Sequence, residues 1–246
     1  MVLIELMEYR YRALVLKKRE VGETDRIYTF FTREAGKISA LAKGVRKSEA
    51  KLASALETGS EVDITIVRTR GMGKVAGAIL ENSYGAAREN FEVLRLVVAT
   101  LNIFDKLVEP DEPDQILFDM LAQYLLTMEL FAREDQSQRT QLVDSGFFFQ
   151  TAFHLGYTLQ LQQCVFSGET LLSGQRYILS PSQGGVINLR YANHVRDGIV
   201  VSEETIKALR LFGSYPLFSI TKILVGSQTL IELERFRGLF LAWIRR

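Results

Sequence analysis

The sequence has one cysteine, two histidines and four prolines among its 246 residues. One thiol cannot form an internal disulfide, so nothing in the chain requires an oxidising compartment. So few prolines argue against long extended linkers. No uncharged apolar run approaches the roughly 18 residues of a membrane helix, and the first residues lack the basic segment of a secretion signal. We therefore expect a cytoplasmic globular protein.

A net charge of only +1 conceals an uneven distribution of charge along the chain. Residues 1–81 contain 15 basic and 11 acidic residues, residues 82–146 contain 5 and 12, and residues 147–246 contain 10 and 6. An acidic middle between two basic ends predicts that a polyanionic partner meets the ends. Unevenly charged, solvated surface explains the same counts equally well.

The residues that usually carry catalysis are scarce. His154 and His194 are 40 positions apart and lack the spacing of metal ligands. We expect His154, on an apolar helix face, to be a core or interface residue, and Cys164 to be a buried thiol. The carboxylates of Asp111, Glu112 and Asp114 are interrupted by Pro113 and preceded by Pro110, which favours a solvated loop over a metal site. Because P-loop and dinucleotide fingerprints are also absent, the sequence predicts a binding protein, not an enzyme, with no cofactor and no metal.

The first third of the chain has the alternating pattern of β-strands. Gly36 lies at a tight turn, where we expect it to take a positive φ. Residues 45–56 do not alternate and suit a short helix or a loop. Five short strands joined by glycine-marked turns predict a small closed barrel. The strands are expected over residues 11–17, 25–32, 38–42, 62–67 and 74–80.

From about residue 86 the apolar period becomes that of helices. Asp114 is expected to cap one helix, Asp144 or Ser145 a second, and Ser202 a third. Residues 164–198, with several glycines, look irregular or weakly β. The sequence therefore predicts an α+β protein with a barrel domain over residues 1–83 and a mostly helical domain over residues 84–246.

Basic residues cluster around the turns of the predicted barrel, where they can neutralise phosphates without reading sequence. Aromatic residues of the same strands can stack on bases, although filling the barrel is the better supported role for any single ring. The aromatic residues are Tyr9, Tyr11, Tyr28, Phe30 and Phe31. The candidate DNA-binding residues are Lys37, Lys43, Arg46, Lys47, Lys51, Arg68, Arg70 and Lys74.

A series of short motifs, in this order and spacing, is similar to the RecO family of recombination mediators. The likeness is strongest over residues 11–83 and continues, more weakly, through most of the chain. The motifs are YRALVL at 11–16, GETDRI at 22–27, FTREAGK at 31–37, AKGVRK at 42–47, ALE at 55–57, RGMG at 70–73, HLGY at 154–157, LSP at 179–181 and GG at 184–185.

The resemblance implies an oligonucleotide-binding (OB) fold barrel followed by a helical domain. It implies non-enzymatic binding of single- and double-stranded DNA, annealing of complementary strands, and help in loading RecA in recombinational repair at the bacterial nucleoid. The implied partners are RecR and the acidic C-terminal tail of single-stranded DNA-binding protein. Such a tail needs an apolar pocket rimmed by basic side chains, for which Lys207, Arg210 and Lys222 are candidates. The neighbouring Leu209 and Phe212 are expected in the core instead.

Many members of the family carry a four-cysteine zinc module in two CxxC pairs. Here Cys164 remains, Ser167 replaces its partner, and Asn188 and Tyr191 stand where the second pair is expected. A lone thiolate cannot hold a structural zinc ion tetrahedrally. We therefore expect a degenerate zinc module over residues 164–198 that keeps its shape by packing and binds no zinc.

Two other functions stay open. The chain can be a scaffold with an OB-fold barrel that binds protein alone, its basic loops merely solvated. It can also be a nuclease or another enzyme, against which the scarcity of histidine and of clustered carboxylates counts.

Overall fold

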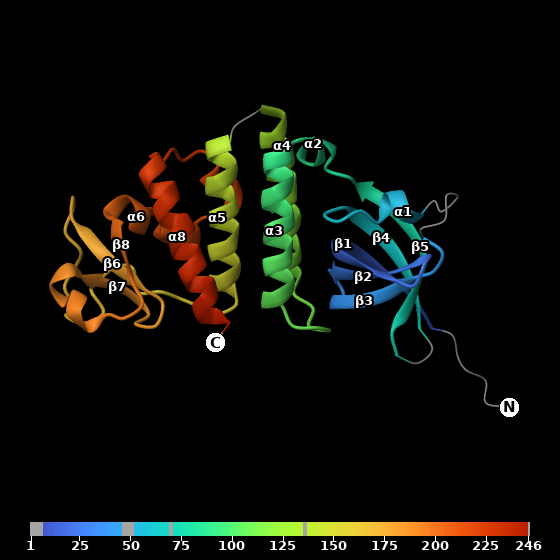
Figure 1. Ribbon diagram of the computed structural model, residues 1–246, viewed down its shortest axis with the longest axis horizontal. Helices are drawn as coiled ribbons and strands as arrows, with labels where there is room; N and C mark the ends of the chain where they lie inside the picture. The colour runs from blue at the N-terminus through green and yellow to red at the C-terminus, as the bar shows by residue number, and fades with distance from the viewer. Residues whose placement is uncertain (1–6, 46–51, 69–70, 135–136, 246) are drawn as a thin grey trace. The chain divides into compact units, whose positions relative to one another are not determined.

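The computed structural model describes residues 7–45, 52–68, 71–134 and 137–245 (Figure 1). The chain forms two compact units, unit 1 over residues 1–135 and unit 2 over residues 136–246. The predicted α+β class, with five strands at the N-terminus followed by helices, is confirmed. Among the described helices, none has the length and apolar character that crossing a membrane requires.

Unit 1 begins with five strands that close into a barrel in the order β1-β2-β3-β5-β4. The paired strands are antiparallel, except that β3 and β5 run parallel. Alternation along each strand directs side chains such as Val15, Phe30 and Ile64 into the barrel. The elements are β1 (Met7–Val21), β2 (Asp25–Thr32), β3 (Gly36–Ala42), α1 (Leu52–Ala55), β4 (Glu61–Arg68) and β5 (Gly73–Asn82).

The turn between β2 and β3 requires glycine for two reasons. Gly36 has a φ of 67°, which confirms the predicted left-handed conformation. An added Cβ would also overlap the backbone oxygen of Glu112, because the segment after the first long helix crosses directly over this turn. The N–H of Asp111 donates a hydrogen bond to the carbonyl of Lys37 at 3.0 Å, which ties that segment to β3.

Three helices complete unit 1: α2 (Gly85–Glu89), α3 (Phe91–Leu107) and α4 (Gln115–Glu134). The outer side chain of Phe31 packs edge-on against Phe104, with ring centroids 5.0 Å apart, and near Phe118 at 6.4 Å. Asp114 caps α4 as predicted, because its carboxylate accepts the N–H of Leu117 at 2.9 Å. The predicted domain boundary after residue 83 falls where the barrel strands end and the helices begin. In the structure, helices α2 to α4 belong to the same compact unit as the barrel.

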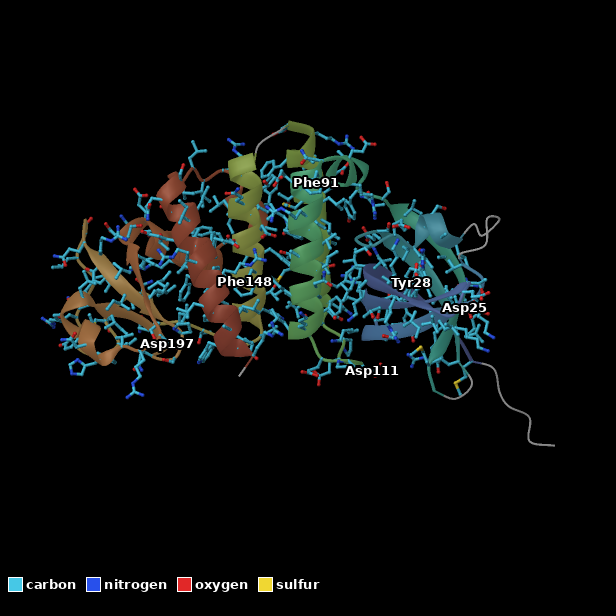
Figure 2. The ribbon with its side chains drawn as sticks, in the orientation of Figure 1. Asp25, Tyr28, Phe91, Asp111, Phe148 and Asp197 are labelled. Atoms are coloured by element: carbon cyan, nitrogen blue, oxygen red, sulfur yellow. The ribbon has the colours of Figure 1, made fainter. Side chains whose placement is uncertain are left out.

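Unit 2 combines helices with a small antiparallel sheet of strand order β7-β6-β8. Its core is aromatic: Phe149 stacks on Phe236, with centroids 5.6 Å apart, and on Phe212 at 6.2 Å. Phe148, labelled in Figure 2, meets Phe240 edge-on. The elements are α5 (Ser137–His154), β6 (Arg176–Ser180), β7 (Gly185–Asn188), the 3-10 helix η1 (Leu189–His194), β8 (Ile199–Ser202), α6 (Glu203–Ser214), α7 (Leu217–Ile220) and α8 (Ser227–Ile244).

Helix α5 begins earlier than predicted, and its last residue lies in a different environment from the one expected. It begins at Ser137, so the expectation that Asp144 or Ser145 caps it is wrong. Both residues are buried within the helix, and Asp144 forms a buried ion pair with Arg237 of α8. This pairing satisfies the carboxylate away from any helix end. His154, expected on a buried apolar face, is the exposed last residue of α5.

Candidate nucleic-acid interface

The outer face of strands β1, β2, β3 and β5 carries two rows of side chains. One row runs through the Cα partners Lys17, Thr29 and Ser39. The second runs through Arg19, Ile27, Leu41 and Lys74. Partners across strands point to the same side of a sheet, so the second row places a cation at each end of a four-strand stretch. This outer face is called the basic face below.

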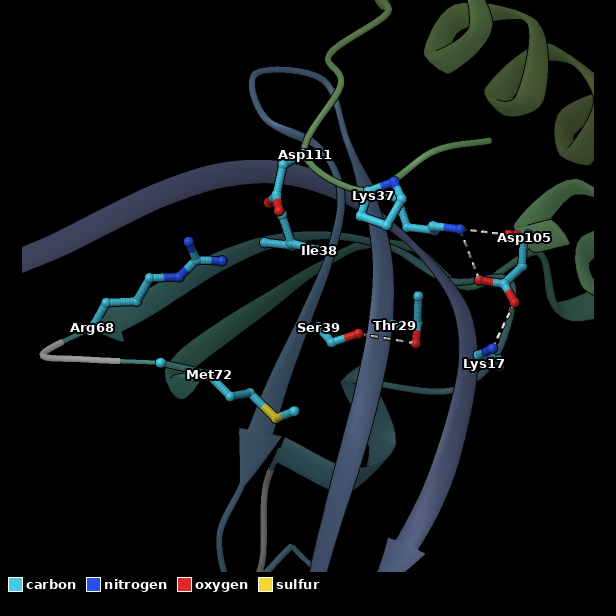
Figure 3. Close-up of a pocket in the computed structure, with 11 residues that line it drawn as sticks. Lys17, Thr29, Lys37, Ile38, Ser39, Arg68, Met72, Asp105 and Asp111 are labelled. Carbon is cyan, nitrogen blue, oxygen red and sulfur yellow. Dashed lines mark hydrogen bonds and ion pairs between the residues drawn. The ribbon is translucent and has the colours of Figure 1, made fainter. Parts of the chain in front are cut away.

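A groove of about 470 Å³ opens at one side of the basic face (Figure 3). Lys17, Lys37 and Arg68 supply its positive charge, while Asp105 and Asp111 supply negative charge. The β4–β5 turn contributes to one wall, and the segment from the end of α3 to residue 111 contributes to another. The full lining comprises Lys17, Thr29, Lys37, Ile38, Ser39, Arg68, Gly71, Met72, Asp105, Pro110 and Asp111.

Asp105 occupies two of the groove's lysines, as the dashed lines in Figure 3 show. Its carboxylate lies 2.5 Å from the ammonium nitrogen of Lys17, and its backbone oxygen accepts from Lys37 Nζ at 2.6 Å. Lys17 keeps 48% of its side chain exposed, whereas Lys37 keeps only 16%. A phosphate entering here therefore meets Lys17 more easily than Lys37.

Arg68 stands across the groove from these lysines in Figure 3. Its Nε is buried and has no hydrogen-bond partner among the described residues. Burial raises the pKa of the neighbouring Tyr11 phenol, and the positive charge of Arg68 opposes that rise. Arg68 therefore lines the groove with a guanidinium whose buried Nε has no acceptor within the described part of the chain.

The structure brings together part of the predicted basic cluster. Lys37 and Arg68 line the groove, and Lys74 lies on the basic face opposite Leu41. Lys43 follows β3 directly and is exposed, as is Lys74, and no ion pair links either lysine to another described residue. The other predicted DNA-binding residues lie outside the described part of the chain, namely Arg46, Lys47, Lys51 and Arg70.

Lys17 and Arg19 are not among the predicted DNA-binding residues, although their spacing in the sequence signals a shared face. Both residues lie at alternate positions of β1, which places them on the same side of the strand. The predicted cluster was drawn around the turns at Gly36, Gly44 and Gly71, whereas Lys17 and Arg19 precede the β1–β2 turn at Gly22. Arg19 is exposed and forms no ion pair with another described residue.

The five aromatic candidates divide between core and surface. Tyr28 and Phe30 fill the barrel, which confirms the core role for these two residues. Phe31 lies outside the barrel and is buried against Phe104 of α3. Tyr9 and Tyr11 instead stack on each other at the N-terminal end of β1, with centroids 6.0 Å apart and planes 4° apart. Tyr9 is 36% exposed, so this pair offers ring surface near Arg68.

A second hollow, of about 580 Å³, lies on the side of the barrel formed by β1, β4 and β5. Its cations Arg10 and Arg12 are matched by the carboxylates of Glu34 and Asp63. The guanidinium Nε of Arg12 is also held 2.7 Å from Glu61. The balance of charge makes this hollow a weaker candidate for a polyanion than the basic face.

The barrel and the part of the chain that follows it each match a known protein family. The family model described as "Recombination protein O N terminal" matches residues 7–84, and "Recombination protein O C terminal" matches residues 88–243. The chain belongs to the RecO family. It is accordingly a protein of DNA repair and recombination.

RecO relatives align with nearly the whole chain. The DNA repair protein RecO of Syntrophomonas wolfei is 24% identical over 230 residues, which cover 94% of this chain and 88% of the relative. RecO of Dehalococcoides mccartyi is 25% identical over 227 residues, 92% of this chain and 87% of the relative. RecO of Myxococcus xanthus is 30% identical over 199 residues, 80% and 78% of the two chains.

The donor set of this RecO chain does not fit a structural zinc ion. The Sγ of Cys164 is buried and accepts the backbone N–H of Asn188 at 3.3 Å. Burial raises the pKa of this thiol, but hydrogen bonds from Ser167 and from backbone N–H groups outweigh burial and lower it. A hydroxyl, an amide and a phenol replace the thiolates that zinc prefers. Hydrogen bonding and packing against Ile178 and Ile187 hold this segment.

The three residues predicted to receive an acidic tail differ in how free they are. Lys207 pairs with Glu203 at 2.8 Å, one helical turn away. Arg210 donates from Nε to the carbonyl of Leu161 at 2.9 Å, so its guanidinium holds the chain that follows α5. Lys222 is exposed, with its nitrogen 5.6 Å from the ring centroid of Phe218. Leu209 and Phe212 are core residues, as expected.

Proposed function

We propose that the chain binds single-stranded DNA along the basic face of an OB-fold barrel and anneals complementary strands there. The observation that carries the proposal is the second row, in which exposed Arg19 and Lys74 stand on one face with Lys43 close by in sequence. Cations in such a row neutralise successive phosphates without selecting bases. The adjoining groove adds Arg68 and the partly exposed Lys17.

Annealing by this route needs no covalent chemistry, so we propose a non-enzymatic role. Two strands repel each other, and a cationic surface reduces that repulsion until base pairing supplies the free energy. By the family resemblance, the chain helps load RecA onto single strands in the bacterial cytoplasm, with RecR and the tail of single-stranded DNA-binding protein as partners. Lys222, Phe218 and the 80% exposed Leu224 supply the cation and apolar surface that suit such a tail.

One observation favours the alternative of a scaffold that binds only proteins. Asp105 already neutralises Lys17 and holds Lys37, which leaves less positive charge for a polyanion. The alternative requires the remaining cations, Arg19, Lys43 and Lys74, to be merely solvated. A measurement of DNA binding against salt separates the two functions, because merely solvated cations displace no counterions from DNA.

The experiment reverses two charges, with Lys43→Glu and Lys74→Glu combined in the full chain. We expect weaker binding of a labelled single strand and a log–log salt slope that flattens by roughly 1.4, about 0.7 for each lost phosphate contact. The control reverses the exposed helix residues Arg95 and Arg235, which changes the net charge equally. Equal slopes for the wild type and for both double variants would refute DNA binding by the basic face.

A further inference from the structure

Three aromatic rings lie side by side in unit 2, where η1 follows β7. Phe166 meets Tyr191 edge-on, with centroids 5.6 Å apart and planes at 78°, and Tyr191 meets His194 at 6.5 Å. Phe166 is 40% exposed and His194 is exposed. Tyr191 is half-buried against the small core that contains Cys164. The core therefore holds the central ring, Tyr191, in place, while Phe166 and His194 face solvent.

Two arginines accompany these rings in the sequence, Arg190 and Arg196. The guanidinium of Arg190 lies 4.9 Å from the ring centroid of Tyr191 and pairs with Glu169. Arg196 is exposed and has no acidic partner among the described residues. The next residue, Asp197 (labelled in Figure 2), accepts hydrogen bonds from two serine hydroxyls at 2.8 and 2.5 Å. Its charge is therefore engaged away from Arg196.

We infer that this surface, made by Phe166, Arg190, Tyr191, His194 and Arg196 and called the η1 surface, binds unpaired bases of single-stranded nucleic acid. Exposed rings interleaved with cations suit a strand whose bases can stack and whose phosphates pass close by. The inference rests on the proposed function, to which it adds a second contact with the strand, located in unit 2. An acidic peptide is a poorer match, because it brings no flat bases to stack on the exposed rings.

Stacking gives the η1 surface a different physical signature from the basic face. Stacking releases few counterions, so its contribution to affinity depends little on salt. Bases inside a duplex are already stacked on their neighbours, so the surface favours single over double strands. The basic face, by contrast, contributes through phosphates and depends steeply on salt.

The test uses Phe166→Ala in the full chain, with a fluorescent oligo(dT) and a duplex of equal length as probes. We expect single-strand affinity to fall roughly fivefold to tenfold, the low end of what losing one stacking ring costs. Duplex affinity and the salt slope should stay unchanged. The control is Phe91→Ala on α3, which removes a ring that is 73% exposed but followed by the acidic Glu92 (Figure 2).

Cross-linking provides a second readout that does not depend on the variant folding. An oligonucleotide carrying 5-iodouracil should cross-link to the wild-type chain within residues 166–194. Unchanged oligo(dT) affinity in a folded Phe166→Ala protein, or cross-links that avoid these residues, would overturn the inference. Suppose that the η1 surface fails this test. The proposed function survives if the Lys43→Glu/Lys74→Glu variant binds single strands more weakly than the wild type, and it fails as well if that variant binds equally well.

Discussion

The carboxylate of Asp105 lies 2.5 Å from the ammonium of Lys17, although 88 residues separate the two in sequence. The same residue holds Lys37 through its backbone oxygen. A fixed negative charge therefore stands in the groove, where a DNA phosphate would otherwise approach. Any strand that enters must compete with this internal anion.

Removing that anion should strengthen DNA binding. Asp105→Asn keeps the shape and the backbone oxygen but frees the charge of Lys17, so we expect single strands to bind roughly twofold to tenfold more tightly at low salt. The salt slope should steepen by about 0.7, the value for one additional phosphate contact. Asp119→Asn is the control. Asp119 forms an ion pair with Arg33, with 3.1 Å between nitrogen and oxygen, and neither residue lines the groove. Weaker binding by folded Asp105→Asn would contradict the competition.

The turn at Gly36 should tolerate no side chain. Gly36→Ala combines a strained positive φ with overlap against Glu112, and we expect it to lower the free energy of unfolding by roughly 2–4 kcal/mol. Gly22→Ala is the control. Its φ is 60°, but apart from its chain neighbours no atom of the described residues lies within 4 Å of the added Cβ, so only the cost of about 1–2 kcal/mol for strain remains. Urea unfolding measures both, and equal losses would show that Glu112 yields.

Glu232 should make unit 2 sensitive to acid. Burial by itself raises the pKa of this carboxyl, but hydrogen bonds from the N–H of Ser202 and the hydroxyl of Thr205 lower it to about 2. A lowered folded-state pKa gives stability that is present above the unfolded-state value and is lost as pH falls towards 2. The contribution is roughly 3 kcal/mol, lost between about pH 5 and pH 2.

Glu232→Gln tests this contribution. We expect it to destabilise the protein at pH 7 and to flatten the fall in stability on acidification, measured by urea unfolding at pH 7, 5 and 4. Glu234→Gln is matched to it on the same helix, because Glu234 is exposed. The assignment fails if the two variants show the same pH dependence.

Lys222 should matter more than Lys207 for binding an acidic tail. Lys222→Glu is expected to lower the affinity for a synthetic peptide matching that tail by roughly tenfold, because it reverses the charge beside the exposed Phe218 ring. Lys207→Glu should weaken it less, since Glu203 already pairs with Lys207. Isothermal titration at two salt concentrations measures both, and an unchanged affinity for Lys222→Glu would exclude this site.

Local signals in the sequence predicted much of the fold. Strand alternation and the Gly36 turn predicted the five strands, and Ser202 caps α6 as expected by accepting the N–H of Thr205. These features depend on residues within a few positions of one another. The same reasoning failed for Asp144, whose polar side chain resembles a helix cap but pairs with Arg237, 93 residues away.

The candidate site was less predictable for the same physical reason. The sequence located Lys43, Arg68 and Lys74, because they lie near glycine turns. It gave no sign that Asp105 would engage Lys37, because nothing local connects α3 to the barrel. Charge counts record how many cations a segment has, whereas the site depends on which of them remain unpaired after folding.

The backbone hydrogen bond from Asp111 to Lys37 fixes one wall of the groove to strand β3. A barrel ending at residue 84 would therefore lack both this wall and the internal anion. It would also expose Phe31 to solvent, because the rings of Phe104 and Phe118 that cover it would be missing. Natural variation in the β2–β3 turn and in the α3–α4 link must accordingly be compatible, because each stretch limits the substitutions that the other can accept.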